Sequence, residues 1–166
     1  MTLKSLALAT AVLAAIPPLW GPVWAHDYRL GALEIDHPWA RATPAGASVG
    51  IGYLVIRNEG ETPDRLVGGD APFAGRVEVH ETTMQDDVMR MRPVVDGLEI
   101  PAGGSVTFEP GGYHVMFVQL QEPLVQGERR TVTLEFANAG TIEVEFVVEA
   151  MAAGGMNHDD HVTPTN

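Results

Sequence analysis

Apolar and polar residues alternate in short runs along most of the chain, and no stretch keeps the 3.6-residue period of an amphipathic helix. The clearest alternation lies near the C-terminal end, where the apolar positions are Ile142, Val144, Phe146 and Val148. Side chains two residues apart lie on the same face of a strand, so this run predicts a strand with one buried face. The preceding Asn138-Ala139-Gly140 predicts a hairpin turn, because Asn and Gly tolerate positive φ.

Turns rich in Gly and Pro separate similar runs along the rest of the chain, which predicts an all-β, antiparallel β-sandwich. The predicted strands are residues 29–35, 48–57, 65–68, 75–80, 88–93, 105–108, 113–120, 130–136 and 141–149. Segment 37–44 contains two prolines, which argue against a central strand. We expect an edge strand or a connecting loop there.

The first 25 residues have the features of a signal peptide. Lys4 supplies a positive start, residues 6–16 form an apolar run, and Val23-Trp24-Ala25 ends on a small residue. We therefore expect export to the periplasm and cleavage that leaves His26 as the mature N-terminus. The apolar run is short and is soon followed by Pro17-Pro18, so we do not expect the protein to be inserted in a membrane.

The remaining chain has the length of one domain with a single core, which we place at residues 26–150. Residues 151–166 lack a core pattern and predict a flexible tail. Once Lys4 is removed, nine arginines face 22 carboxylates, a formal charge of −13 that argues against nucleic acid as a partner. The chain has no cysteine, so packing alone must hold the fold.

The residues with metal-binding side chains concentrate in two places. His114 and Met116 are two residues apart in a strand-like run, and such neighbours share a face. His80 and Met91 lie on either side of a turn-like run at residues 84–87. If Gln85 and Asp86 are the two central turn residues, His80 lies directly opposite Met91.

Two imidazoles and two thioethers suit Cu(I) better than they suit Zn, Mg or Ca, because the thioether is a soft, uncharged ligand. The sequence therefore predicts a Cu(I) site built from three strands by His80, Met91, His114 and Met116.

Further candidate donors lie elsewhere in the chain. Met84 and Met89 are candidate accessory thioethers near the turn, and His26 is a candidate ligand at the mature N-terminus. We expect a second, weaker site that favours Cu(II) in the tail, where the donors are Met151, Met156, His158 and His161. His37 precedes a proline and is more typical of a packing residue than of a ligand.

The pattern of His80, ten residues, Met91, 22 residues and His114-x-Met116 resembles the signature of the periplasmic copper chaperones of the PCuAC type. Its second gap is one residue longer than usual and falls in a region rich in Gly and Pro. The resemblance extends over nearly the whole mature domain, including segments 36–44, 89–93 and 110–114.

This resemblance implies a cupredoxin-like or immunoglobulin-like sandwich that holds Cu(I) at a shallow site made by the same four residues. It implies a chaperone and not an enzyme. The implied acceptor is the Cu(A) centre of cytochrome c oxidase subunit II, reached together with a Sco-type thioredoxin-like protein. Neutral ligands suit that role, because a cysteine-bearing acceptor can displace them one by one.

Three other functions are compatible with parts of the sequence. A periplasmic copper sequestration or tolerance protein would use the same site. A copper oxygenase would chelate Cu(II) through the α-amine and ring of His26 with one further histidine. In a β-sandwich interaction module the metal-binding residues would be coincidental. An electron-transfer cupredoxin is excluded, because it needs a cysteine thiolate.

Overall fold

The computed structural model describes residues 28–150, which form eleven strands and, within that range, no helix. The strands are β1 (Tyr28–Leu30), β2 (Leu33–Arg41), β3 (Val49–Asn58), β4 (Asp64–Asp70), β5 (Ala74–Gln85), β6 (Val88–Pro93), β7 (Leu98–Ile100), β8 (Ser105–Thr107), β9 (Tyr113–Leu120), β10 (Arg129–Phe136) and β11 (Gly140–Glu149). The predicted all-β class is confirmed.

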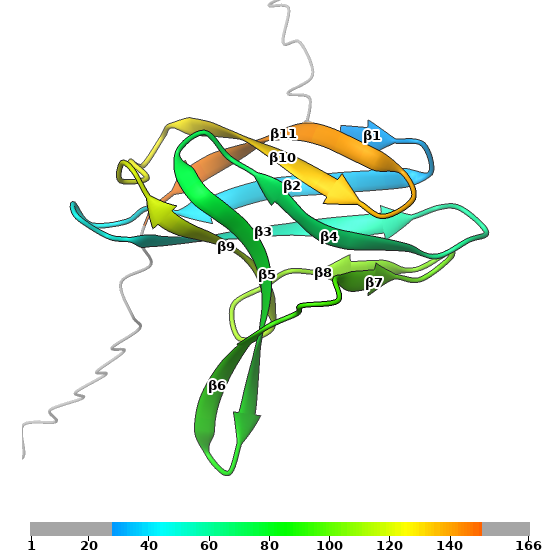
Figure 1. Ribbon diagram of the computed structural model, residues 1–166, viewed down its shortest axis with the longest axis horizontal. Coiled ribbons are helices and arrows are strands. Elements are labelled where there is room, and N and C mark those ends of the chain that lie inside the picture. Colours follow the sequence, from blue (N-terminus) through cyan, green and yellow to red (C-terminus); the bar gives the residue numbers. More distant parts are fainter. Residues whose placement is uncertain (1–27, 151–166) are drawn as a thin grey trace, which may run out of the picture.

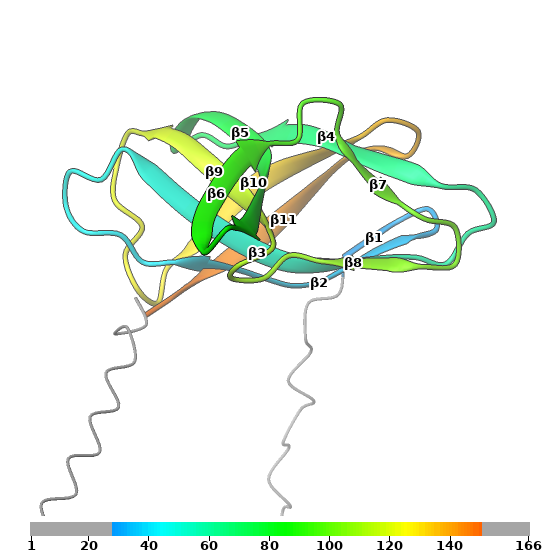
Figure 2. The same cartoon turned by 90° about the horizontal axis from the view of Figure 1, so that it is seen from below.

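The strands form one sheet that closes on itself (Figure 1). Its order is β2-β11-β10-β4-β5-β9-β3, and β3 pairs with β2 to close the ring. The ladders are antiparallel except for β11 with β2, which is parallel. The predicted sandwich is therefore a flattened barrel, whose narrow profile is visible in Figure 2.

One hydrophobic core fills the barrel. The alternation predicted for β11 is confirmed, since Val144, Phe146 and Val148 are buried, and Phe136 pairs with Gly140 across the predicted hairpin. Phe117 of β9 packs edge-on against Phe146, with ring centroids 5.5 Å apart. Burying side chains of this size stabilises the fold by about 1.5–3 kcal/mol each.

The expectation of an edge or loop at 37–44 is wrong for its first half. Strand β2 continues to Arg41 between β3 and β11. Pro38 is tolerated because His37, with φ 46°, and Pro38 are left out of the β2–β3 ladder, which resumes at Trp39. Because Pro38 lies in this bulge, the β2–β3 ladder does not need the backbone N–H that proline lacks.

Three further differences from the predicted strands change the arrangement of the chain. The strand expected at 29–35 is interrupted at Gly31, whose φ of 59° turns the chain between β1 and β2. The short strand β7 was missed. Strand β5 runs five residues beyond His80, to Gln85, and with β6 forms a hairpin that projects from the barrel (Figure 1).

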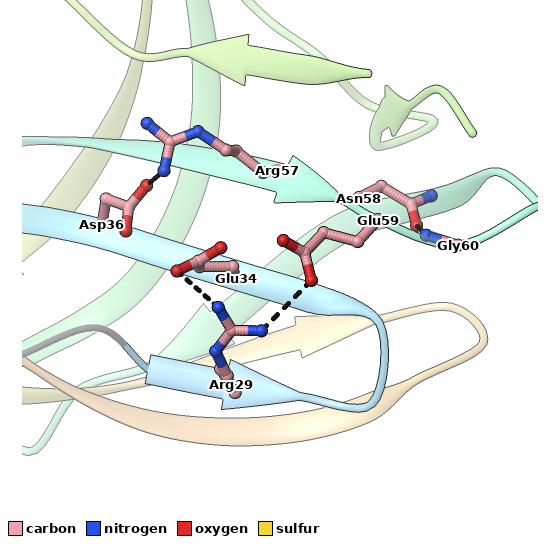
Figure 3. Close-up of polar contacts among 7 residues, drawn as sticks. All are labelled: Arg29, Glu34, Asp36, Arg57, Asn58, Glu59 and Gly60. Atoms are coloured by element: carbon pink, nitrogen blue, oxygen red, sulfur yellow. Dashed lines mark hydrogen bonds and ion pairs between the residues drawn. The ribbon is translucent and has the colours of Figure 1, made fainter. Parts of the chain in front are cut away.

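Charged pairs cover the outer side of β1, β2 and β3 (Figure 3). Arg29 donates hydrogen bonds to Glu34 at 2.9 Å and to Glu59 at 3.1 Å, and Arg57 pairs with Asp36. Both arginine side chains are more than half exposed, so each pair contributes about 0–1 kcal/mol.

The predicted signal peptide and tail lie outside the described residues. The same holds for the candidate ligands His26, Met151, Met156, His158 and His161. Between residues 28 and 150 the chain forms no helix that is long and apolar enough to cross a bilayer.

Candidate metal centre

The two histidines of the predicted site lie side by side in the barrel wall. His80 of β5 is directly opposite His114 of β9, and their ring centroids are 5.9 Å apart. On the same two strands Val79 and Val115 are buried in the core. Because side chains alternate along a strand, both imidazoles lie on the opposite, outward face of the sheet.

The predicted pairing of His80 with Met91 is wrong. The central turn residues are Asp86 and Asp87, both with positive φ, so His80 pairs with Pro93 and Met91 pairs with Thr82. The pattern of apolar residues did not settle this, because hairpin registers that differ by two residues keep the same faces. Two consecutive positive φ angles define the mirror-image turn that suits a hairpin, and Asp adopts them at modest cost.

The corrected register still leaves Met91 on the face of His80. Met91 is opposite Thr82, which is two residues from His80 along β5. Such diagonal neighbours are about 7 Å apart, within reach of a long side chain. The fourth predicted ligand, Met116, shares the outward face with His114 and lies opposite Glu78. The fold thus brings all four predicted residues to one face of β5, β6 and β9.

Each imidazole has one nitrogen engaged and one free. His114 Nδ1 lies 3.1 Å from the carbonyl oxygen of Gly112, which can only accept, so Nδ1 carries the proton. His80 Nε2 lies 2.9 Å from a carboxylate oxygen of Glu78 and donates to it in the same way. The two remaining nitrogens, His80 Nδ1 and His114 Nε2, are buried without a hydrogen-bond partner.

Two unpaired lone pairs in a buried place carry a cost unless something binds them. Leaving one buried acceptor unsatisfied costs about 1–3 kcal/mol. A metal ion coordinated by both nitrogens would remove that cost. The ring separation of 5.9 Å leaves room for a cation coordinated by both rings, and the two unpaired nitrogens are the candidate ligand atoms.

Burial keeps His114 in the form that binds metal. Desolvation lowers the pKa of His114, the hydrogen bond to the Gly112 carbonyl raises it, and nearby His80 lowers it, with a net lowering. His114 is 3% exposed. The imidazole is therefore neutral near pH 7, as a ligand must be.

The site is less shallow than the resemblance implied. The side chain of His80 is only 12% exposed and His114 is buried, whereas Met91 is 45% exposed. Within residues 28–150 there is no group of three or more His, Asp or Glu side chains that could hold a metal.

Glu78 is a functional candidate that sequence reasoning missed. It lies two residues before His80, and this spacing within a strand was the available signal. Its second oxygen lies 3.4 Å from Arg76 Nε, which holds the carboxylate in place. His37, by contrast, lies on the β2 bulge, 76% exposed and near Glu149, on a strand that pairs with neither β5 nor β9.

Comparison with known proteins identifies the family. Residues 33–148 match the family model described as "Putative lipoprotein LpqE-like". The chain belongs to this LpqE-like family. A relative in Leifsonia xyli subsp. xyli, "Putative lipoprotein Lxx21020", is 28% identical over 126 residues, which cover 76% of this chain and 75% of that protein.

Solved structures agree with the assignment to PCuAC-type proteins, as predicted. The copper-bound PCuAC domain from PmoF2 is 30% identical, with a TM-score of 0.64 over 75% of this LpqE-like chain and 98% of that domain. The apo PCuAC domain from PmoF1 is 29% identical, with a TM-score of 0.64 over 75% and 99% of the two chains. CuI-DR1885 from Deinococcus radiodurans is 28% identical, with a TM-score of 0.56 over 75% and 81%.

Proposed function

We propose that this LpqE-like protein is a copper chaperone that carries Cu(I) on His80, Met91, His114 and Met116. The observation that carries the proposal is the pair of buried, unpaired nitrogens, His80 Nδ1 and His114 Nε2, on neighbouring strands. Two methionines on the same face supply sulfur. The matched structures that are described as copper-bound and as CuI-DR1885 support copper as the cargo.

The donor set favours the lower oxidation state. Two neutral nitrogens and two neutral sulfurs suit Cu(I), which accepts trigonal or tetrahedral sites, and thioethers have little affinity for hard cations. A thioether sulfur has no proton to lose when the metal binds, unlike a cysteine thiol.

The unequal exposure of the ligands suggests an order of release. Met91 is on the projecting hairpin and is 45% exposed, whereas His80 and His114 are held in the barrel wall. An incoming acceptor thiolate would displace the Met91 sulfur first and the sheltered imidazoles afterwards. Copper stays Cu(I) throughout, since one soft ligand replaces another.

We place the protein outside the cytoplasm, in the periplasm, after removal of the predicted signal peptide, and a lipoprotein family description supports export. The acceptor we propose is the Cu(A) centre of cytochrome c oxidase subunit II, in cooperation with a Sco-type protein. Copper sequestration would use the same site but would not require transfer. The protein is proposed to be a carrier and not an enzyme.

An anaerobic Cu(I) titration against a chromophoric chelator tests the proposal. The protein should bind Cu(I) at His80 and His114, and H80Q/H114Q should lose that binding. M91L and M116L should weaken Cu(I) far more than Cu(II), because only the soft ion gains from sulfur. V88A, which alters an exposed apolar residue on the same hairpin, is the matched control. Equal losses for both oxidation states would contradict the Cu(I) assignment.

Transfer is tested separately from binding. Copper-loaded protein mixed with a Sco-type acceptor should lose Cu(I) to the acceptor's thiolates, and a protein that retains its copper would be a sequestration protein. Turnover with O₂ or peroxide would instead favour the copper oxygenase.

A further inference from the structure

The hairpin of β5 and β6 exposes methionine to an extent that the fold does not explain. Met84, Met89 and Met91 are 64%, 65% and 45% exposed. With Val88 they make up half of the large exposed hydrophobic side chains in the described range. The whole of β6 is exposed, so these side chains are not core residues of the barrel.

The strand register puts the three sulfurs on one face. Met84 lies directly opposite Met89, which brings their Cβ atoms to about 5 Å, and Met91 lies two residues further along β6. The next pair on that face is Thr82 with Met91, and the one after it is His80 with Pro93. A row of thioethers therefore runs from the tip of the hairpin to the histidine pair. We call this the thioether face.

The opposite face of the hairpin has a different chemistry. Its pairs are Glu81 with Arg92, Thr83 with Arg90, and Gln85 with Val88. Both arginines are thus kept off the thioether face, where they would repel a cation. At the tip, Asp86 and Asp87 add two carboxylates that attract one.

We propose that Met84, Met89 and Met91 form a second Cu(I) site, made of thioethers alone, which receives the ion at the hairpin tip and passes it to His80 and His114. Met91 belongs to both sites, so the ion gains one ligand as it leaves another and remains Cu(I). The inference rests on the proposed copper function. It deepens that function by assigning the point of entry.

The turn prepares this site before the metal arrives. Asp86 and Asp87 adopt the positive φ angles of a tight hairpin turn, which fixes the register that sets Met84 against Met89. At the base of the hairpin, Thr82 N donates a hydrogen bond to the carbonyl oxygen of Gly112 at 3.0 Å, which links the hairpin to the turn before β9. Affinity should nevertheless be lower than at the histidine site, because three exposed flexible side chains must be ordered.

Titration of the full chain with Ag(I), a soft ion without redox chemistry, tests the proposal by NMR of ¹³C-methyl methionine. The first equivalent should shift the methyl signals of Met91 and Met116, and the second should shift those of Met84 and Met89. M84I/M89I should lose the second event, keep the first, and take up Cu(I) several-fold more slowly from a small-molecule donor. V88A, on the opposite face, should behave as the wild type.

The H80Q/H114Q variant separates this proposal from the main one. If the Met84 and Met89 signals still shift in that variant, the thioether site exists independently of the histidine site. If they do not move in the wild type at excess Ag(I), or if M84I/M89I titrates and takes up Cu(I) like the wild type, the second site is refuted, whatever the histidine site does. A hairpin that serves only as an apolar docking surface would give that result.

Discussion

His80 of β5 lies directly opposite His114 of β9, and each ring has one nitrogen hydrogen-bonded to an oxygen on its own strand or in the adjoining turn. His80 donates to Glu78, and His114 donates to the Gly112 carbonyl. The two hydrogen bonds orient both rings in advance. The lone pairs of the two remaining nitrogens are thereby held at fixed positions, which preorganises half of the proposed metal site.

Glu78 should therefore control affinity without being a required ligand. E78L removes the acceptor that holds the proton of His80 on Nε2, and we expect Cu(I) affinity to fall by about 10–100-fold, the usual cost of losing such an outer partner. ¹⁵N spectra of the imidazole would report the loss of a single tautomer. R76Q, which removes only the ion pair with Glu78, is the control. An E78L protein with unchanged affinity and tautomer would contradict this role.

His114 should make the metal-free protein sensitive to mild acid. Its pKa is lowered by burial, so below the unfolded pKa of about 6.5 the unfolded chain binds a proton that the folded chain resists. The stability contributed by keeping His114 neutral is present above pH 6.5 and is lost as the pH falls toward the lower folded pKa. Urea unfolding of the wild type and of H114Q between pH 7.5 and 5 measures this. H114Q should show the shallower decline, and parallel curves would count against it.

The Asp86-Asp87 turn should be easier to form with glycine at its second position. Asp87 has φ 60°, a conformation that glycine adopts without steric cost, so D87G should stabilise the hairpin by about 0.5–1 kcal/mol. Hydrogen exchange at the amides of Thr83 and Arg90, which form a hydrogen-bonded pair in this register, reports this local opening directly. D86A should have the opposite effect. Faster exchange in D87G would mean that the turn is not under this constraint.

Asp64 should be a stability residue remote from the metal centre. It is 8% exposed. Its carboxylate accepts hydrogen bonds from the backbone amides of Arg65 and of Asn138 and Ala139, which lie in the turn between β10 and β11. D64A leaves these amides without their partner and should cost about 1–3 kcal/mol in urea unfolding. D96A, at an exposed position, should be neutral. Cu(I) affinity should not change in either variant.

Much of the fold was available in local patterns. The period of two along Ile142, Val144, Phe146 and Val148 arises within a single strand, because one of its faces is buried and the other is in contact with water. The structure confirms both the strand and its turn. The prediction for segment 37–44 was wrong because it also rested on a local pattern alone. A proline argues against a strand locally, but the bulge at His37 and Pro38 removes the need for its missing donor.

The sequence by itself determined the donor inventory: two histidines and two methionines at strand spacing, no cysteine, and therefore a preference for a soft ion. Only the tertiary structure decided that His80 pairs with His114, 34 positions away, and that Met91 approaches diagonally. Pairing between distant strands depends on the packing of the whole barrel, which no short window of residues contains. The role of Glu78 depends on that pairing too. A carboxylate two residues from a histidine is common in sequences. Glu78 becomes a candidate positioning residue because the fold buries the other nitrogen of the His80 ring next to the His114 ring.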